Sequence, residues 1–315
     1  RQTIEPMQRN GSWNLTRTAF QVPARFDGQK VGWAVVLCVP NSGRHSIGMF
    51  ANNLRNVADE RNMHLGDLIG DGPIDAAGYI ASKSGLEAFL SEEVERLERG
   101  WGKKVGLLLA VMSDSAGENG KFVFPALKRW SHTISGIPVQ CCQVSKALKT
   151  GDKKKMAGDS GYAAGLLLKM NLKLGGENCY ASSPERIGSG QHGLALMERE
   201  PQGTMVVGLD VHHASPGSQG ASFAAVVASL DMQCVKMRTI VTTQEMVDDP
   251  NNGSRKQRQE IVHTLYETMV DLLHEFCTKD CFGTGGRPPR RIVFFRDGVA
   301  HNQFEAVTEQ EIEQI

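Results

Sequence analysis

Two aspartates in the second half of the chain lie where apolar segments end. Asp210 is part of the segment 205–211, and Asp297 follows the segment 291–295. A carboxylate in such surroundings requires a hydrogen bond, a cation or a metal ion to offset its desolvation. If the two segments are neighbouring parallel strands, both carboxylates meet at one point and suit Mg²⁺ or Mn²⁺. Two such ions about 4 Å apart support phosphodiester cleavage. The alternative is that each Asp only caps a turn.

A third carboxylate, Glu260, follows the polar insertion 247–258, at the start of a helix expected over about 259–277. A lone Glu at a helix start is most often a solvent residue favoured by the helix dipole, so Glu260 alone is weak evidence. Three other features of this half favour structural roles: the pair His212-His213, Cys277 with Cys281, and Asp231, which we expect to cap a turn.

A basic stretch in the first half could bind phosphate. Residues 121–173 carry ten lysines and arginines against two aspartates. Lys169 and Lys173 are four residues apart, so a helix would place both ammonium groups on one face, where they repel each other and attract an anion. Further members of such a site are Lys128, Gln140 and Phe124, whose ring could stack on a base. The alternative is a solvated helix face, which we prefer for Lys153–Lys155 as an exposed loop.

The first half also carries the pattern of an α/β layer. Trp33–Pro40 and Val105–Met112 are near-continuous apolar runs, which is typical of buried parallel strands. Between them, apolar spacings of three and four predict helices over about 47–57 and 84–99, the second with Gly100 at its C-cap. This order of elements indicates parallel strands.

The second half begins after a Gly- and Ser-rich stretch, 175–193, which we take as the domain boundary. Strand-like runs cover about 205–211, 222–230 and 235–243, and the helix and the last strand follow. The length of 315 residues favours about two domains. With 40% hydrophobic residues the chain is not mainly disordered, and no apolar run approaches the ~18 residues of a membrane span.

The net charge and the cysteine content indicate what kind of nucleic-acid site and which cellular compartment to expect. The net charge is zero, so a nucleic-acid site must be a local patch. Seven scattered cysteines without a CxxC pair favour a reducing compartment, and we expect a cytoplasmic location. The start at Arg1, without a charged-then-apolar leader, indicates a fragment or a processed chain.

In their order and spacing, these motifs resemble Argonaute proteins. GLDVHHASPG, SFAAVVASLD, RQEIV and RIVFFRDGVAHNQF resemble the PIWI domain, while FPALKR, PVQCCQ and LLKMNLKLGGEN resemble the MID domain that precedes it. NGSWNLTRTAF resembles the linker entering MID. The resemblance implies an α/β protein with a linker over 1–29, a Rossmann-like MID domain over 30–180 and an RNase H-like PIWI domain over 181–315, whose C-terminal part is missing. Within the family, a fungal, quelling-type Argonaute is the expected relative.

The resemblance also implies roles for the candidate residues. Asp210, Glu260 (the "glutamate finger") and Asp297 would bind two Mg²⁺ or Mn²⁺ ions and cut the target RNA. The 5′-phosphate of the guide RNA would be held by Lys128, Gln140, Lys169 and Lys173, with the backbone at Cys141 assisting. Implied partners are a 5′-phosphorylated single-stranded guide RNA, a complementary target RNA and silencing proteins, and no membrane.

Two departures from the family pattern matter. Phe124 stands where the family usually has Tyr, so a hydroxyl hydrogen bond worth about 1 kcal/mol is lost. The chain also stops at Ile315, before the family's fourth metal ligand, so this chain alone is expected to be inactive while the complete protein cleaves RNA. The rival readings are a slicing-inactive Argonaute that silences through partners and an unrelated RNase H-like nuclease or integrase.

Overall fold

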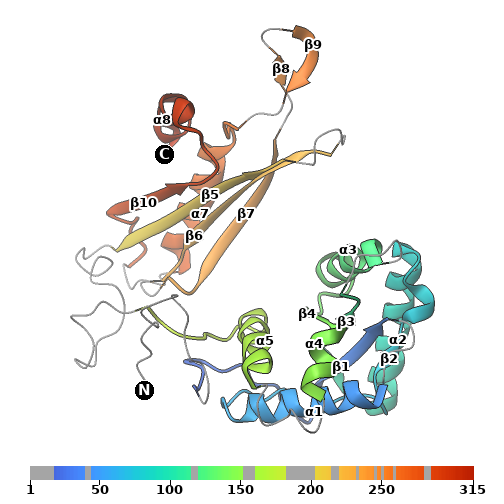
Figure 1. The fold of residues 1–315 in the computed structure, drawn as a ribbon. Coiled ribbons are helices and arrows are strands. Elements are labelled where there is room, and N and C mark those ends of the chain that lie inside the picture. The colour runs from blue at the N-terminus through green and yellow to red at the C-terminus, as the bar shows by residue number, and fades with distance from the viewer. Residues whose placement is uncertain are drawn as a thin grey trace. The chain divides into compact units, whose positions relative to one another are not determined.

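The computed structural model describes most of the chain, in two compact units that divide between Cys179 and Tyr180. The described residues are 18–39, 44–114, 120–151, 160–181, 203–213, 220–231, 234–244, 247–249, 252–257, 260–279 and 285–315. Each of the two units contains its own sheet (Figure 1). Lys153–Lys155 and Cys281 lie outside the described residues, so the predictions made for them are not tested.

The first unit is built on a sheet of four parallel strands in the order β2-β1-β3-β4 (Figure 1). These strands are β1 (Val31–Cys38), β2 (Ile74–Asp75), β3 (Lys104–Met112) and β4 (Val139–Gln143). Strand β1 is buried over all but its first residue and pairs with β3, as expected for apolar runs that face helices on both sides. The two predicted parallel strands are therefore confirmed.

Helices cover both faces of this sheet. One face packs against α1 (Arg44–Asp59), α4 (Val144–Gly151) and α5 (Ser160–Lys173), and the other against α2 (Lys83–Trp101) and α3 (Val123–Arg129). Alternate residues of β1 enter the two cores: Trp33 lies on the side of α1 and Ala34 on the side of α2. The result is a Rossmann-like, doubly wound arrangement.

Helix α2 corrects one prediction from the sequence. Its N-cap is Ser82, whose hydroxyl accepts a hydrogen bond from the Gly85 N–H at 3.3 Å. The helix continues through Gly100 and ends at Gly102, which adopts a left-handed φ of 63°. The predicted cap at Gly100 was therefore wrong by two residues, because the residue that supplies the left-handed conformation is the second glycine of the pair.

The second unit contains a mixed sheet in the order β10-β5-β6-β7. Its strands are β5 (Thr204–His212), β6 (Ser222–Ser229), β7 (Met237–Gln244) and β10 (Arg291–Arg296). β10 runs parallel to β5, and the other pairs are antiparallel. The predicted contact between the first and last strands of this half is confirmed. Helix α7 (Leu265–Lys279) packs against one face through residues such as Leu272 and Phe276.

Smaller elements complete the second unit. The polar insertion forms an antiparallel hairpin of β8 (Val247–Asp249) and β9 (Asn252–Gln257), and α8 (Phe304–Gln310) follows β10. The α/β class predicted from the sequence, with a Rossmann-like unit followed by an RNase H-like unit, is confirmed. Within the described part of the chain, no helix has the length and apolarity needed to cross a membrane.

Candidate functional site

The ammonium group of Lys173 is fixed at the start of β4. Lys173 lies in the last turn of α5, and its Nζ donates hydrogen bonds to the Val139 carbonyl at 2.6 Å and to Gln140 Oε1 at 2.9 Å. Gln140 is itself buried and donates through Nε2 to the Cys141 carbonyl at 2.7 Å. Because an ammonium has three donors, one N–H of Lys173 remains for a ligand.

Lys128 approaches from helix α3. Its Nζ lies 5.5 Å from the centroid of the Phe124 ring, four residues earlier on the same helix, which is the geometry of a cation–π contact. The Phe124 side chain is 47% exposed, so part of its surface is open to a ligand. Lys128 and Phe124 therefore combine a positive charge with an accessible flat surface.

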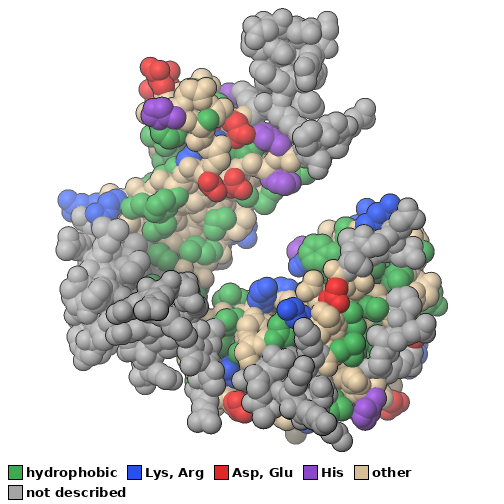
Figure 2. All heavy atoms as spheres, viewed as in Figure 1, with side chains coloured by type: hydrophobic (Ala, Val, Ile, Leu, Met, Phe, Trp, Pro, Cys, Tyr) green, Lys and Arg blue, Asp and Glu red, His purple; other side chains and the backbone are tan. Residues whose placement is uncertain are grey.

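Lys169 lies on the same helix as Lys173, one turn earlier, as the four-residue spacing predicted. Burial is the main cause that lowers the pKa of Lys173, and the charges of Lys128 and then Lys169 lower it further, while Cys141 acts in the opposite direction. Figure 2 shows lysine and arginine side chains exposed on this unit. Among the described residues, none of the three lysines forms an ion pair, so an anion would relieve their repulsion.

Cys141 lies within the same electrostatic environment. Burial raises the pKa of its thiol, and the charges of Lys128 and Lys173 oppose that rise. The structure thus gathers α3, β4 and α5 around one positively charged point, which we call the lysine cluster (Lys128, Lys169 and Lys173).

The two aspartates of the second unit lie on neighbouring strands. The Asp297 N–H donates to the carbonyl of Leu209, the residue before Asp210, at 3.0 Å, which continues the parallel pairing of β10 with β5. Gly298 has a φ of 76°, and a Cβ added there would lie 3.7 Å from Asp210 Oδ1. Both carboxylates are exposed near the carboxyl-terminal ends of β5 and β10, and we call them the aspartate pair.

Glu260 is held by residues from β10 and from the end of β5. Its Oε1 lies 2.6 Å from His213 Nε2, and His213 Nδ1 lies 2.7 Å from the Ser222 hydroxyl. Its backbone carbonyl accepts a hydrogen bond from Arg296 Nη2 at 2.7 Å. The sequence reasoning set His213 aside, yet this side chain contacts a candidate catalytic residue. Figure 2 shows acidic and histidine side chains exposed on this unit.

A buried ion pair connects the segments that carry Glu260 and Asp297. Arg296 donates through Nε to Glu311 Oε2 at 2.9 Å and through Nη1 to the Asp297 carbonyl at 2.5 Å. The Glu311 side chain is fully buried, and its Oε1 accepts from the Val262 N–H at 2.9 Å. These contacts use backbone groups on either side of residue 261, and α7 begins at Leu265 rather than at the predicted 259.

The donors at these strand ends fit a hard cation only in part. Asp210 and Asp297 supply carboxylate oxygens, the ligands that Mg²⁺ and Mn²⁺ prefer. Within the described ranges, however, no group of three or more His, Cys, Asp or Glu side chains has the geometry to hold a metal ion. Glu260 is bound to His213 instead of joining the aspartates. The three-carboxylate metal site therefore stays a prediction.

Comparison with known proteins identifies the family. The Piwi domain model matches residues 117–315. The protein argonaute of Schizosaccharomyces pombe is 26% identical over 312 residues, which cover 97% of this chain and 31% of that protein. The curated relatives that the chain matches are much longer, and it spans 18% to 31% of the length of three of them.

Two solved structures share the fold. The Neurospora crassa QDE-2 AGO MID-PIWI domains match with a TM-score of 0.62 at 18% identity, over 94% of this chain and 70% of that one. The Kluyveromyces polysporus Argonaute with a guide RNA matches with a TM-score of 0.67 at 19% identity, over 91% of this chain and 28% of that one. At such identities these matches report the fold alone, so the quelling-type assignment stays a prediction.

Proposed function

Because the chain belongs to the Argonaute family of Piwi-domain proteins, we propose that its first unit binds the 5′-phosphate of a guide RNA. The observation that supports this proposal is the lysine cluster, in which Lys128 and Lys169 act electrostatically on a fixed Lys173 and no described residue forms an ion pair with any of the three. The similar Kluyveromyces polysporus protein was solved with a guide RNA. In this proposal residues 1–29 are the linker, 30–180 the MID domain and 181–315 part of the PIWI domain.

A terminal phosphate suits this cluster better than an internal phosphodiester. A phosphomonoester carries a charge of about −1.5 to −2 at neutral pH and offers three acceptor oxygens. Lys173 supplies its remaining N–H, and Lys128 on α3 and Lys169 on α5 add positive charge. Gln140 acts indirectly, because it holds the Lys173 ammonium in place, and the backbone at Cys141 holds Gln140.

The exposed ring of Phe124 is positioned to stack on the first base of the guide. Stacking of a base on an aromatic side chain is worth about 1–3 kcal/mol and depends little on base identity. Phe124 lies beside Lys128, so a nucleotide held at its phosphate by the lysines has an aromatic surface within reach.

For the complete protein we propose cleavage of a target RNA at the aspartate pair. Asp210 and Asp297 would provide metal ligands from adjacent parallel strands, and Glu260 would join them from the segment after the β8–β9 hairpin. Mg²⁺ or Mn²⁺ bound there would stabilise the attacking and leaving oxygens of phosphodiester hydrolysis. The protein's own contribution is to place Asp210 and Asp297 on adjacent strands and to fix the backbone at Glu260 through Arg296, so that the Glu260 side chain would join the aspartates once it exchanged His213 for a metal ion.

A second candidate is a guide-binding Argonaute that does not cleave and silences through partner proteins. The observation that favours it is the contact between Glu260 and His213, which leaves only two adjacent carboxylates at the ends of β5 and β10. Target cleavage by the complete protein distinguishes the two candidates, since both bind a guide RNA in the same way.

The guide-binding proposal is tested with the double variant Lys169→Ala, Lys173→Ala. We expect its preference for 5′-phosphorylated over 5′-hydroxyl RNA to disappear, because two charge-assisted contacts of about 1.5–3 kcal/mol each are lost. The control is Lys30→Ala, which removes an exposed lysine of the same unit outside the cluster. Unchanged phosphate discrimination in the double variant would reject the assignment.

A further inference from the structure

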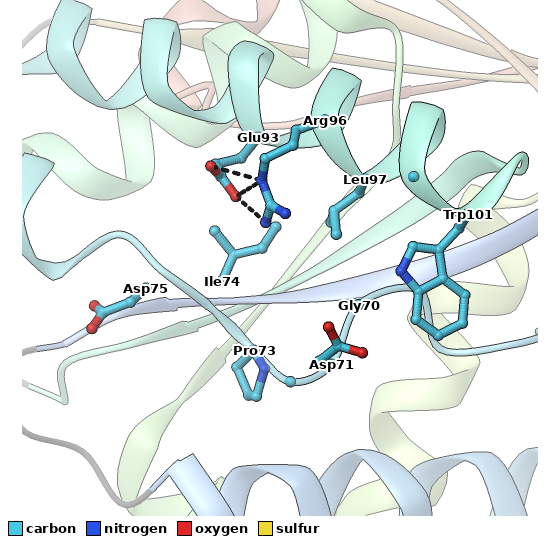
Figure 3. A pocket seen from close by; sticks show the side chains of 11 residues that line it. Gly70, Asp71, Pro73, Ile74, Asp75, Glu93, Arg96, Leu97 and Trp101 are labelled. Atoms are coloured by element: carbon cyan, nitrogen blue, oxygen red, sulfur yellow. Dashed lines mark hydrogen bonds and ion pairs between the residues drawn. The ribbon is translucent and has the colours of Figure 1, made fainter.

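The first unit contains a cavity that the guide site does not use. It has a volume of about 570 Å³ and lies between the loop 70–73 with β2 on one side and the C-terminal half of α2 on the other (Figure 3). The loop leads into β2, which is one edge of the sheet, whereas the lysine cluster lies at β4, the opposite edge. The two sites are therefore separated by the width of the sheet.

The cavity combines an apolar floor with an aromatic wall. Leu97 and Ile74 are buried and line its base, and the Trp101 side chain is 42% exposed. Gly70 and Gly100 add no side chains that would fill the space. The volume lies within the range of about 300–1,000 Å³ that is usual for ligand sites.

The charged residues of the cavity are mostly acidic. Asp71, Asp75 and Glu93 face a single cation, Arg96. Glu93 is engaged by Arg96, with Oε2 2.7 Å from Nη2 (Figure 3), and Asp75 Oδ1 accepts a hydrogen bond from the Ala77 N–H at 3.0 Å.

Asp71 remains available to a ligand. It forms no hydrogen bond and no ion pair with any residue that the structure describes. Its charge nevertheless acts on the cavity, since it adds to the effect of Glu93, the main cause that raises the pKa of Arg96. After the Glu93–Arg96 pair is set aside, the carboxylate of Asp71 gives this part of the cavity a negative charge.

We propose that this cavity binds a basic peptide segment of a protein partner, with an arginine or lysine side chain stacked on Trp101 and paired with Asp71. Trp is the best aromatic partner for a cation, and an adjacent carboxylate adds an ion pair. Arginine suits the site better than lysine, because its planar guanidinium can stack and hydrogen-bond at the same time.

The negative charge of the cavity favours a basic peptide over RNA. The phosphates of a nucleic acid are repelled by Asp71 and Asp75 and attracted to the lysine cluster at the other edge of the sheet. The first unit can therefore hold a guide RNA at β4 and a basic peptide at β2 without competition, and fields of opposite sign steer each ligand to its own site.

The test uses the 315-residue chain and the probe peptide acetyl-Gly-Arg-Arg-Gly-amide, followed by NMR at the Trp101 indole N–H. We expect this signal to shift and saturate at millimolar peptide. The acidic control peptide acetyl-Gly-Glu-Glu-Gly-amide should cause no shift. Asp71→Asn should weaken binding about tenfold, the equivalent of about 1.4 kcal/mol. Glu95→Gln, an exposed acid of α2 outside the cavity, should bind as the wild type does.

A second variant keeps the test independent of one side chain. Trp101→Ala, followed at the Gly100 amide, should also lose binding about tenfold while circular dichroism stays unchanged. The proposal is overturned if no shift occurs up to about 10 mM peptide, if Asp71→Asn binds with full affinity, or if the acidic peptide binds equally well. Displacement of the peptide by adenosine monophosphate would also overturn it. Shifts that depend on chain concentration alone would overturn it too, because they would indicate a second copy of the chain as the occupant.

Discussion

The lysine cluster of the first unit and the aspartate pair of the second each bring like charges close together, but different neighbouring groups stabilise the two sets of charges. Lys173 is held by neutral acceptors, the Val139 carbonyl and Gln140. The aspartate pair adjoins a buried ion pair, Arg296 with Glu311. Neutral acceptors leave a positive charge fully available to an anion, whereas the ion pair fixes the backbone and leaves the carboxylates to a separate cation.

This difference indicates which of the two sites can bind its ligand without rearrangement. All three lysines lie on helices that pack around one parallel sheet, and none of them requires a further element. The carboxylate site still depends on Glu260, which His213 holds. We therefore expect the lysine cluster to bind phosphate without rearrangement, whereas a three-carboxylate metal site requires Glu260 to give up its contact with His213. Four perturbations test this comparison, from the largest expected effect to the smallest.

The largest effect should follow Asp297→Ala in the complete protein. Loss of one of two adjacent carboxylate ligands should lower Mg²⁺-dependent target cleavage about a thousandfold, or about 4 kcal/mol of transition-state stabilisation. Guide binding should not change, because the lysine cluster lies in the other unit. Single-turnover cleavage and guide titration measure the two quantities, and cleavage at the wild-type rate would contradict the metal role.

Glu311→Ala should destabilise the second unit by about 3 kcal/mol. The variant leaves buried Arg296 with only the longer ion pair to Glu260 Oε2, at 3.8 Å, and removes the acceptor of the Val262 N–H. Urea unfolding reports the change in free energy of unfolding. Glu313→Ala removes an exposed acid two residues later and serves as the control. Equal midpoints for both variants would show that the buried pair does not stabilise this unit.

Guide binding at the lysine cluster should depend on pH through the protonation of Lys173. Burial and neighbouring charges lower the pKa of Lys173 from its usual 10.5, so the ammonium loses its proton at a lower pH than an ordinary lysine does. Affinity for 5′-phosphorylated guide should therefore fall as the pH rises toward 10.5, the usual pKa of a lysine. In Lys173→Arg the side chain stays charged over this range, so the fall should be weaker. A flat profile in the wild type would exclude Lys173 from the site.

The smallest effect should follow Phe124→Tyr. The added hydroxyl should gain one hydrogen bond to the guide phosphate and tighten binding by about 1 kcal/mol, roughly fivefold. Phe122→Tyr adds the same group to a neighbouring ring and should leave affinity unchanged. A large loss of affinity in Phe124→Tyr would mean that this ring does not face the phosphate.

Local patterns predicted the framework that positions both sites. Continuous apolar runs indicated buried parallel strands, and the expected pairing of β5 with β10 placed Asp210 next to Asp297. The four-residue spacing placed Lys169 and Lys173 on one helix face. Asp231 was expected to cap a turn, and its carboxylate accepts hydrogen bonds from the Val235 and Lys236 N–H groups at 2.9 and 3.1 Å.

The contacts around Glu260 could not be predicted in the same way, because they join residues far apart in the sequence. His213 reaches Glu260 across 47 positions, and Glu311 reaches the Val262 N–H across 49. Neither pair has a local spacing rule. The one available signal was Arg296, a charged residue at the end of an apolar strand next to Asp297, where burial requires a partner.

The central claim is tested most directly by the affinity of this chain for one short single-stranded RNA, prepared with either a 5′-phosphate or a 5′-hydroxyl and titrated at two salt concentrations. We predict a clear preference for the phosphate, larger at the lower salt because the lysine cluster acts through charge. Equal affinity of the two RNAs at both salt concentrations would contradict the assignment of the lysine cluster as a guide 5′-phosphate site.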